Sequence, residues 1–253
     1  MKYAIACLFF FHLCFSAWAA NVTNGVLCLT FDDRNFGGWE QAIPLFKKYH
    51  ATATFFFGGQ IDAAALSCMK KLRENGHTIG LHGVNHKRAT SVFAEAGAEF
   101  YIRTEINPQL DACREAGIPV RHWAYPENDR NDDTDQALSK LFKRFRAGGI
   151  STRITPKIPL KARSEPFFPV DDIPRHPLMR GIGVGAYYDT EVEDFLEGIR
   201  RAASRNEVLI LYSHNIAPDA KHIHMPAATL EAFLKEAANN GVCVLGFDDL
   251  DPK

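Results

Sequence analysis

The sequence predicts a single-domain α/β protein whose parallel strands close, or nearly close, into a distorted (β/α)7–8 barrel. Short runs of apolar and β-branched residues alternate with amphipathic stretches of helical period along most of the chain. With 253 residues, 46% hydrophobic and 23% charged, the chain can bury one large core. A doubly wound open sheet is the alternative. In both folds, functional side chains are expected at the carboxyl ends of the strands.

The elements follow in order along the chain. Apolar, β-branched and aromatic runs predict strands at 27–33, 52–57, 77–81, 120–125, 147–151, 208–212 and 242–246. Apolar residues spaced three and four apart predict helices at 39–49, 63–74, 94–116, 132–145, 190–204 and 227–240. Pro44 is expected to kink or delay the first of these helices, and Pro108 to interrupt the third.

The stretch 153–180 breaks this alternation. It contains six prolines, which argue against regular elements: Pro156, Pro159, Pro166, Pro169, Pro174 and Pro177. We expect a long surface excursion here, a feature that is usually functional in a compact domain.

The first residues differ in kind from the rest. Lys2 precedes an almost wholly apolar stretch, 3–15, and Ala17 and Ala19 place small residues where a signal peptidase recognises them. We therefore expect a signal peptide at 1–19, one catalytic domain at 20–253, and a secreted or periplasmic protein. A retained membrane anchor is the alternative. No later apolar run is long enough to span a bilayer.

Charge and cysteine content exclude other classes. The formal net charge of −1 gives no overall positive potential that would attract nucleic acid or an anionic membrane. After signal removal four cysteines remain, Cys28, Cys68, Cys113 and Cys243, without the CxxC spacing of a structural zinc site. We expect them to behave as small buried hydrophobic residues.

The first strand ends on two adjacent carboxylates, Asp32 and Asp33. Successive side chains on an extended strand point to opposite faces, so the two can share a site only if the chain turns there. Different roles are therefore expected for them. A polar turn without function is the alternative, because aspartate favours turns.

Two histidines four residues apart, His82 and His86, follow the third strand. This spacing places both rings on one side of a tight loop, as zinc requires. With one carboxylate from the first strand they would form a three-ligand site that leaves a position for water. Chance histidines, surface or core, are the alternative.

A further imidazole, His214, ends the strand at 208–212. A lone histidine at such a place is often only a hydrogen-bonding residue. Together with a metal and a spare carboxylate, however, it completes the set that metal-assisted hydrolysis of an acyl group requires.

These residues carry a family resemblance. Residues 26–250 resemble the polysaccharide deacetylases of carbohydrate esterase family 4, the NodB homology domain, whose fold is a distorted barrel related to the TIM barrel. The motifs occur in the family's order: Thr30-Phe31-Asp32-Asp33, His82 to His86, Trp123-Ala124-Tyr125-Pro126 and Leu211-Tyr212-Ser213-His214.

The resemblance implies roles for the site residues. Asp33, His82 and His86 would bind a divalent metal, most simply Zn²⁺. Asp32 would be the general base and His214 the general acid. The backbone N–H of Tyr125 would help to stabilise the oxyanion.

The sequence also departs from the family pattern. Arg34 stands where glycine is usual and could favour an acidic substrate from the site entrance. Gly83 replaces the usual serine or threonine between the histidines, which removes one loop-stabilising hydrogen bond. The third motif lacks its arginine, a role that neither Arg121 nor His122 can simply be assigned. The fourth motif is missing, so the partner of His214 is open; the candidates are Asp171, Asp172, Arg175 and Asp189.

The sequence thus predicts a metal-dependent deacetylase of acetylated polysaccharides or oligosaccharides. A carbon–nitrogen hydrolase of the same fold acting on small amides, and a carbohydrate-binding protein with a degenerate site, are the alternatives. Trp39, Trp123 and Tyr125 are candidate sugar-stacking surfaces, although core packing suits Trp39 better.

Overall fold

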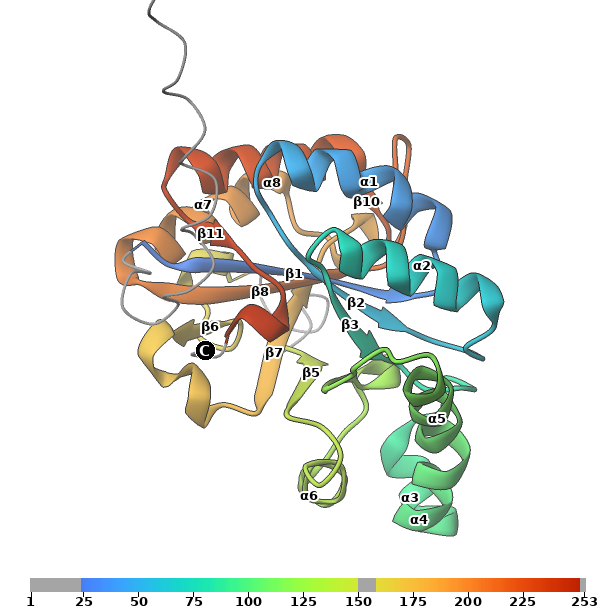
Figure 1. Cartoon of the computed structure of the whole chain (residues 1–253). Coiled ribbons are helices and arrows are strands. Elements are labelled where there is room, and N and C mark those ends of the chain that lie inside the picture. Colours follow the sequence, from blue (N-terminus) through green and yellow to red (C-terminus); the bar gives the residue numbers. More distant parts are fainter. Residues whose placement is uncertain (1–23, 150–157, 251–253) are drawn as a thin grey trace, which may run out of the picture.

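A parallel barrel forms the centre of the computed structural model, which describes residues 24–149 and 158–250 (Figure 1). Neighbouring strands pair in the order β1, β2, β3, β4, β5, β7, β8, and β8 pairs with β1 to close the ring. The bounds are β1 (Val26–Asp33), β2 (Thr54–Phe57), β3 (Thr78–Leu81), β4 (His122–Ala124), β5 (Arg144–Gly148), β7 (Leu178–Gly183) and β8 (Glu207–Ser213). The closing pair excludes the open-sheet alternative.

Four short strands lie outside this ring. β11 (Cys243–Val244) pairs with the start of β1, and β6 (Phe167–Pro169) runs antiparallel to β8. β9 (Ile216–Ala217) and β10 (Met225–Pro226) form a separate pair after β8.

Helices surround the barrel. Figure 1 shows α1, α7 and α8 along one side and α3, α4 and α5 gathered at another. Their bounds are α1 (Phe36–Lys48), α2 (Ala63–Glu74), α3 (Ala89–Ala96), α4 (Ala98–Tyr101), α5 (Asn107–Glu115), α6 (Asp132–Leu138), α7 (Val192–Arg205) and α8 (Ala227–Asn239). A π-helical turn, Ile102–Ile106, joins α4 to α5.

Alternation along β1 separates the two layers of the core. Leu27, Leu29 and Phe31 pack in the large cluster beneath the helices, whereas Val26 and Cys28 pack in the smaller cluster inside the barrel. Since side chains alternate along a strand, Asp32 continues the inward series at the carboxyl end.

Three sequence predictions need correction. The helix expected at 132–145 ends at Leu138, because the following arginines belong to β5. The proline-rich stretch contains β6 and the start of the barrel strand β7, since its prolines fall largely between the elements. Pro108 does not itself break a helix: it occupies the first turn of α5, where its missing N–H costs little, and the irregularity is the π-helical turn before it.

The prediction for the cysteines holds for three of four. Cys28, Cys68 and Cys113 are buried, whereas Cys243 is exposed. Burial raises the pKa of Cys68 to about 12 and that of Cys113 to about 11, so both thiols remain protonated. The predicted signal peptide and the end of the strand expected at 147–151 lie outside the described residues.

Candidate active site

Asp33, His82 and His86 come together at the carboxyl ends of β1 and β3. Asp33 Oδ1 lies 3.8 Å from His82 Nε2 and 4.0 Å from His86 Nε2, and one ligand atom from each residue lies within 4.8 Å of the others. Zinc takes nitrogen and oxygen ligands at about 2.0–2.2 Å, so one ion fits after a small inward movement of the half-exposed His86. The residues expected to bind a metal therefore form one group.

His82 is held in the form that a metal ligand requires. Its Nδ1 lies 2.9 Å from the Ala124 carbonyl, which fixes the proton on Nδ1 and leaves the lone pair of Nε2 facing Asp33. Burial lowers the pKa of His82 to about 4, although Asp32 and Asp33 act in the opposite direction. The ring is therefore neutral at neutral pH.

The backbone turns at two of the three ligands. Asp33 has φ of 83° and His86 has φ of 54°, in the left-handed region that residues other than glycine rarely occupy. The turn at Asp33 is the one that two adjacent aspartates need to serve one site. Such strain persists where the surrounding structure enforces it, commonly at functional sites.

Asp32 is buried inside the barrel against a second buried residue, Arg146. Arg146 Nη2 donates to Asp32 Oδ2, and Nη1 donates to Asn128 Oδ1 at 2.6 Å. Burial alone would raise the pKa of Asp32, but Arg146, with His82 and His214, holds it below its ordinary value. Asp32 Oδ1 has no hydrogen-bond partner within the described part of the chain. Asp32 is thus ionised, with one oxygen available.

The sequence analysis does not identify Arg146, because it predicts a helix at 132–145 directly before this residue. The signal was the alternation Arg144-Phe145-Arg146-Ala147, which is the period of a strand. Both arginines are buried, whereas Phe145 packs in the outer cluster. Arg146 thus places a buried cation from β5 against Asp32.

His214 stands on the other side of Asp33. Its Nε2 lies 4.0 Å from Asp33 Oδ2, and Trp39 Nε1 donates to its carbonyl oxygen at 2.8 Å. His214 Nδ1 lies 3.1 Å from the carbonyl oxygen of Ile223. The partner left open by the sequence is therefore a backbone carbonyl, which no side-chain motif could have revealed.

Tyr125 lies beside the site but its N–H is engaged. The N–H donates to the Arg146 carbonyl at 3.0 Å, and the buried side-chain hydroxyl donates to Asp135. The Tyr125 N–H is therefore already paired within the protein. In the adjoining turn, Glu127 has φ of 52°.

Arg34 is fixed by its own neighbourhood. Its guanidinium donates to Asp62 Oδ2 at 2.7 Å and to the carbonyl oxygens of Gly58 and Gln60, and it lies over the Phe36 ring. These contacts tie the loop after β1 to the loop after β2. The charge is paired, which argues against Arg34 as a selector of acidic substrates.

The aromatic residues expected to stack on sugar are buried. Trp39, Trp123 and Tyr125 are fully buried and pack in the core. Among the large hydrophobic residues of 24–149 and 158–250, the exposed aromatic ones are Phe100 and Tyr187, each about two-fifths exposed.

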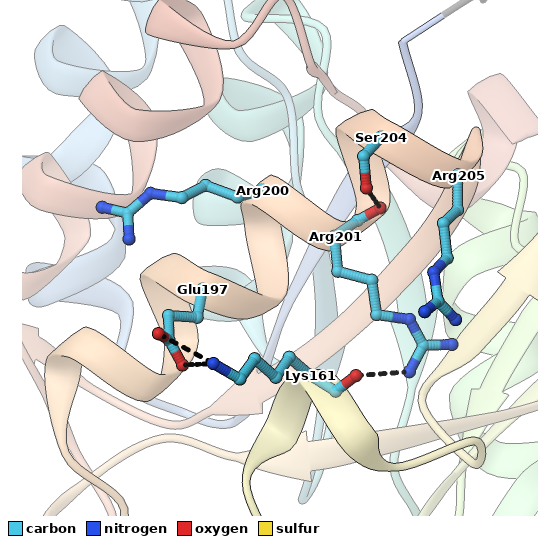
Figure 2. A pocket seen from close by; sticks show the side chains of 6 residues that line it. All are labelled: Lys161, Glu197, Arg200, Arg201, Ser204 and Arg205. Carbon is cyan, nitrogen blue, oxygen red and sulfur yellow. Dashed lines mark hydrogen bonds and ion pairs between the residues drawn. The ribbon is translucent and has the colours of Figure 1, made fainter.

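Two of the hollows on the described surface differ in their relation to the site. One of about 930 Å³ borders the metal-ligand group, with His86, Lys87, Ser91 and Phe100 in its wall. The other, of about 410 Å³, lies over α7 (Figure 2). None of the active-site side chains lines this second hollow, where Lys161 pairs with Glu197 at 3.0 Å. The first is therefore the one that a substrate at the metal site would meet.

Residues 19–145 match the family described as polysaccharide deacetylase, about half of the chain. The matched segment includes the three metal-ligand candidates and Asp32, and it ends before Arg146 and His214. Within the described ranges no helix combines the length and apolarity needed to cross a membrane.

Three proteins illustrate the similarity. The chain is 27% identical over 89 residues to a peptidoglycan deacetylase of Helicobacter pylori, covering 35% of this chain and only 30% of that protein. It is 25% identical over 157 residues to a peptidoglycan-N-acetylglucosamine deacetylase of Bacillus cereus, covering 53% and 74%. The structure of a Streptococcus mutans CE4 esterase superposes with a TM-score of 0.58 at 16% identity, covering 92% of each chain, which shows a common fold.

Proposed function

Because the chain belongs to the polysaccharide deacetylase family, we propose that it is a metal-dependent hydrolase that removes acetyl groups from N- or O-acetylated carbohydrate polymers. The observation that carries this proposal is the grouping of Asp33, His82 and His86 between a buried carboxylate, Asp32, and a separate imidazole, His214.

Asp33, His82 and His86 would hold the metal, most simply Zn²⁺. The donor set of two imidazole nitrogens and one carboxylate oxygen suits zinc, and it leaves a position open. When bound, the ion lowers the pKa of water and polarises a carbonyl.

Asp32 would act as the general base. Its free Oδ1 can accept a proton from the attacking water, while Arg146 holds the other oxygen and keeps the carboxylate ionised. The buried position of both groups fixes their orientation and excludes competing solvent.

His214 would act as the general acid. The Ile223 carbonyl accepts from Nδ1–H and so orients the ring, leaving Nε2 to protonate the departing nitrogen or oxygen of the sugar.

An open site supports a polymeric substrate. His86 and Asp33 are 44% and 39% exposed, and the hollow beside them opens to solvent. A small-amide hydrolase would instead enclose its substrate. Relatives named as peptidoglycan deacetylases make peptidoglycan the first polymer to test, and they suit the predicted secreted or periplasmic location.

Acetate release with metal analysis tests the proposal. The purified protein is expected to contain about one zinc per chain. It should release acetate from peptidoglycan or another acetylated glycan, lose that activity after chelation, and regain it when Zn²⁺ is added. Absence of acetate release from peptidoglycan, chitin oligomers, poly-N-acetylglucosamine and acetylated xylan by the zinc-loaded protein would contradict it.

A further inference from the structure

The loop between the two histidine ligands is held by side chains from the helical segment opposite it. Gly83 N donates to Gln109 Oε1 at 3.1 Å, and Asn85 N donates to Glu105 Oε2 at 2.8 Å. Lys87 N makes a longer contact of 3.5 Å with the same Glu105 oxygen. The loop therefore receives its acceptors from the π-helical turn and α5.

Glu105 lies within the π-helical turn, and its side chain is buried. Besides the two N–H groups, it accepts from Asn85 Nδ2 at 2.8 Å through Oε1. The carboxylate oxygens of Glu105 accept hydrogen bonds from Asn85 and Lys87 of this loop. Within residues 24–149 and 158–250, no cationic side chain forms an ion pair with Glu105. Burying a carboxylate costs free energy unless it is hydrogen-bonded. The charge-assisted hydrogen bonds from the loop to Glu105 offset this cost, and they also fix the position of the loop.

Gln109 also hydrogen-bonds to the segment after β2 that contacts the third metal-ligand candidate, Asp33. Its side-chain amide donates to the carbonyl oxygens of Phe57 and Gly59, at 3.0 and 2.7 Å. Gly58 N in turn donates to the Asp33 carbonyl. One helical segment thus contacts the chain on both sides of the metal-ligand group. π-Helical turns are rare and occur often at functional sites.

Gly83 explains why the support must come from outside the loop. It has φ of +86°, and a Cβ there would lie 3.1 Å from Glu105 Oε2. A serine or threonine between the histidines would therefore need this carboxylate to move. With glycine at position 83 there is no side-chain hydroxyl to stabilise the loop from within. The loop is hydrogen-bonded to Glu105 instead.

We propose that Glu105 is the positioning residue that sets the spacing of His82 and His86, with Gln109 linking that loop to Asp33. This rests on the proposed metal-dependent function but concerns residues that do not contact the metal. Loss of a partner that orients metal ligands typically costs about 10- to 100-fold in metal affinity.

Zinc affinity of the full chain tests the proposal, measured by competition with a chromophoric chelator. Glu105→Ala should bind Zn²⁺ about 10- to 100-fold more weakly than wild type. Glu105→Gln keeps one acceptor oxygen and should lie between the two. Glu99→Ala, a change at an exposed glutamate on α4, is the matched control and should bind as wild type does. The Michaelis constant of zinc-saturated Glu105→Gln should stay within about twofold of wild type, because Glu105 orients the ligands and does not bind substrate.

Wild-type affinity in Glu105→Ala would overturn the proposal. If circular dichroism shows that this variant does not fold, Glu105→Gln decides: weaker zinc binding supports the proposal, and unchanged binding overturns it. A wild-type protein that binds zinc but releases no acetate would defeat the proposed function alone, because the affinity comparison does not depend on turnover.

Discussion

The tripeptide Phe-Asp-Asp occurs twice in this chain, at Phe31-Asp32-Asp33 and at Phe247-Asp248-Asp249, and the two copies lie at opposite ends of the barrel. The first ends β1 at the carboxyl end. The second forms a 3-10 turn whose N–H groups donate to Thr54 and Thr78, near the starts of β2 and β3.

In each copy the first aspartate binds an arginine. Asp32 is buried with Arg146, whereas Asp248 is 40% exposed and pairs with Arg121 at 2.7 Å and with His122 at 3.0 Å. The second aspartates differ more. Asp33 faces two histidines across an open group, whereas Asp249 accepts from the Thr52 hydroxyl. The same three residues thus form a candidate site where carboxylate oxygens lack hydrogen-bond partners. They form a structural contact where the carboxylate oxygens are hydrogen-bonded.

Exchanging the first aspartate in each copy should give the largest contrast. Asp32→Asn removes the proposed base and should lower kcat for acetate release by about 100-fold or more. Asp248→Asn should leave kcat within about twofold but lower the free energy of unfolding by about 1–3 kcal/mol, since the buried His122 loses its carboxylate partner. Steady-state assays and urea unfolding of both variants measure the two effects. Equal losses of kcat would show that the two copies do not differ in function.

Replacing Arg146, which pairs with Asp32 at the carboxyl end of the barrel, should have the second-largest effect. Arg146→Met leaves Asp32 buried without its cation, so the free energy of unfolding should fall by about 3–5 kcal/mol. Activity of the folded fraction should fall about tenfold or more, because the base loses its orientation. Arg146→Lys keeps the charge and should retain more of both properties. Wild-type stability in Arg146→Met, measured by urea unfolding, would show that this pair is not structural.

The smallest expected effect concerns pH at the amino end. His77 precedes β3, its ring lies between Phe46 and Phe55, and its Nδ1 accepts from Ala53 N. Burial, aided by Lys47, lowers its pKa from 6.5 to about 4. Between these values the unfolded chain binds a proton that the folded chain excludes, so stability must fall as pH falls from about 6.5 to 4.

Urea unfolding at pH 7 and pH 5 measures this contribution. Wild type should lose up to about 2 kcal/mol more than His77→Gln over that interval, because the variant lacks the titrating ring. Activity at pH 7 should be the same in both, since His77 lies away from the site. The same pH dependence in both proteins would assign the acid sensitivity to other groups.

Much of the fold and the metal-ligand group could be predicted from sequence. The strand–helix alternation gave the barrel, and the polar residues at strand ends gave Asp33, His82, His86 and His214, because parallel strands bring their carboxyl ends together. The structure confirms that these four lie together.

The features that the sequence did not predict have different physical origins. β7 was overlooked because prolines beside a strand resemble prolines within a loop. Arg146 is not identified because buried arginines are rare, so a charged residue next to a predicted helix gives no sign of a barrel strand. The Ile223 carbonyl and the engaged N–H of Tyr125 are backbone contacts, which depend on the path of the chain and leave no mark in residue type.

The pairing of β1 with β8 also determines when the site can exist during folding. Thr30 Oγ1 donates to the Leu211 carbonyl across 181 residues of sequence, and that contact lies beside Asp32 and His214. Closing so long a loop is slow and carries an entropic cost that local contacts do not share. A chain that has paired β1 to β3 but not to β8 would hold the metal-ligand candidates without His214, the proposed general acid. Under the proposed mechanism, activity should therefore require the β1–β8 pairing and should report closure of the ring.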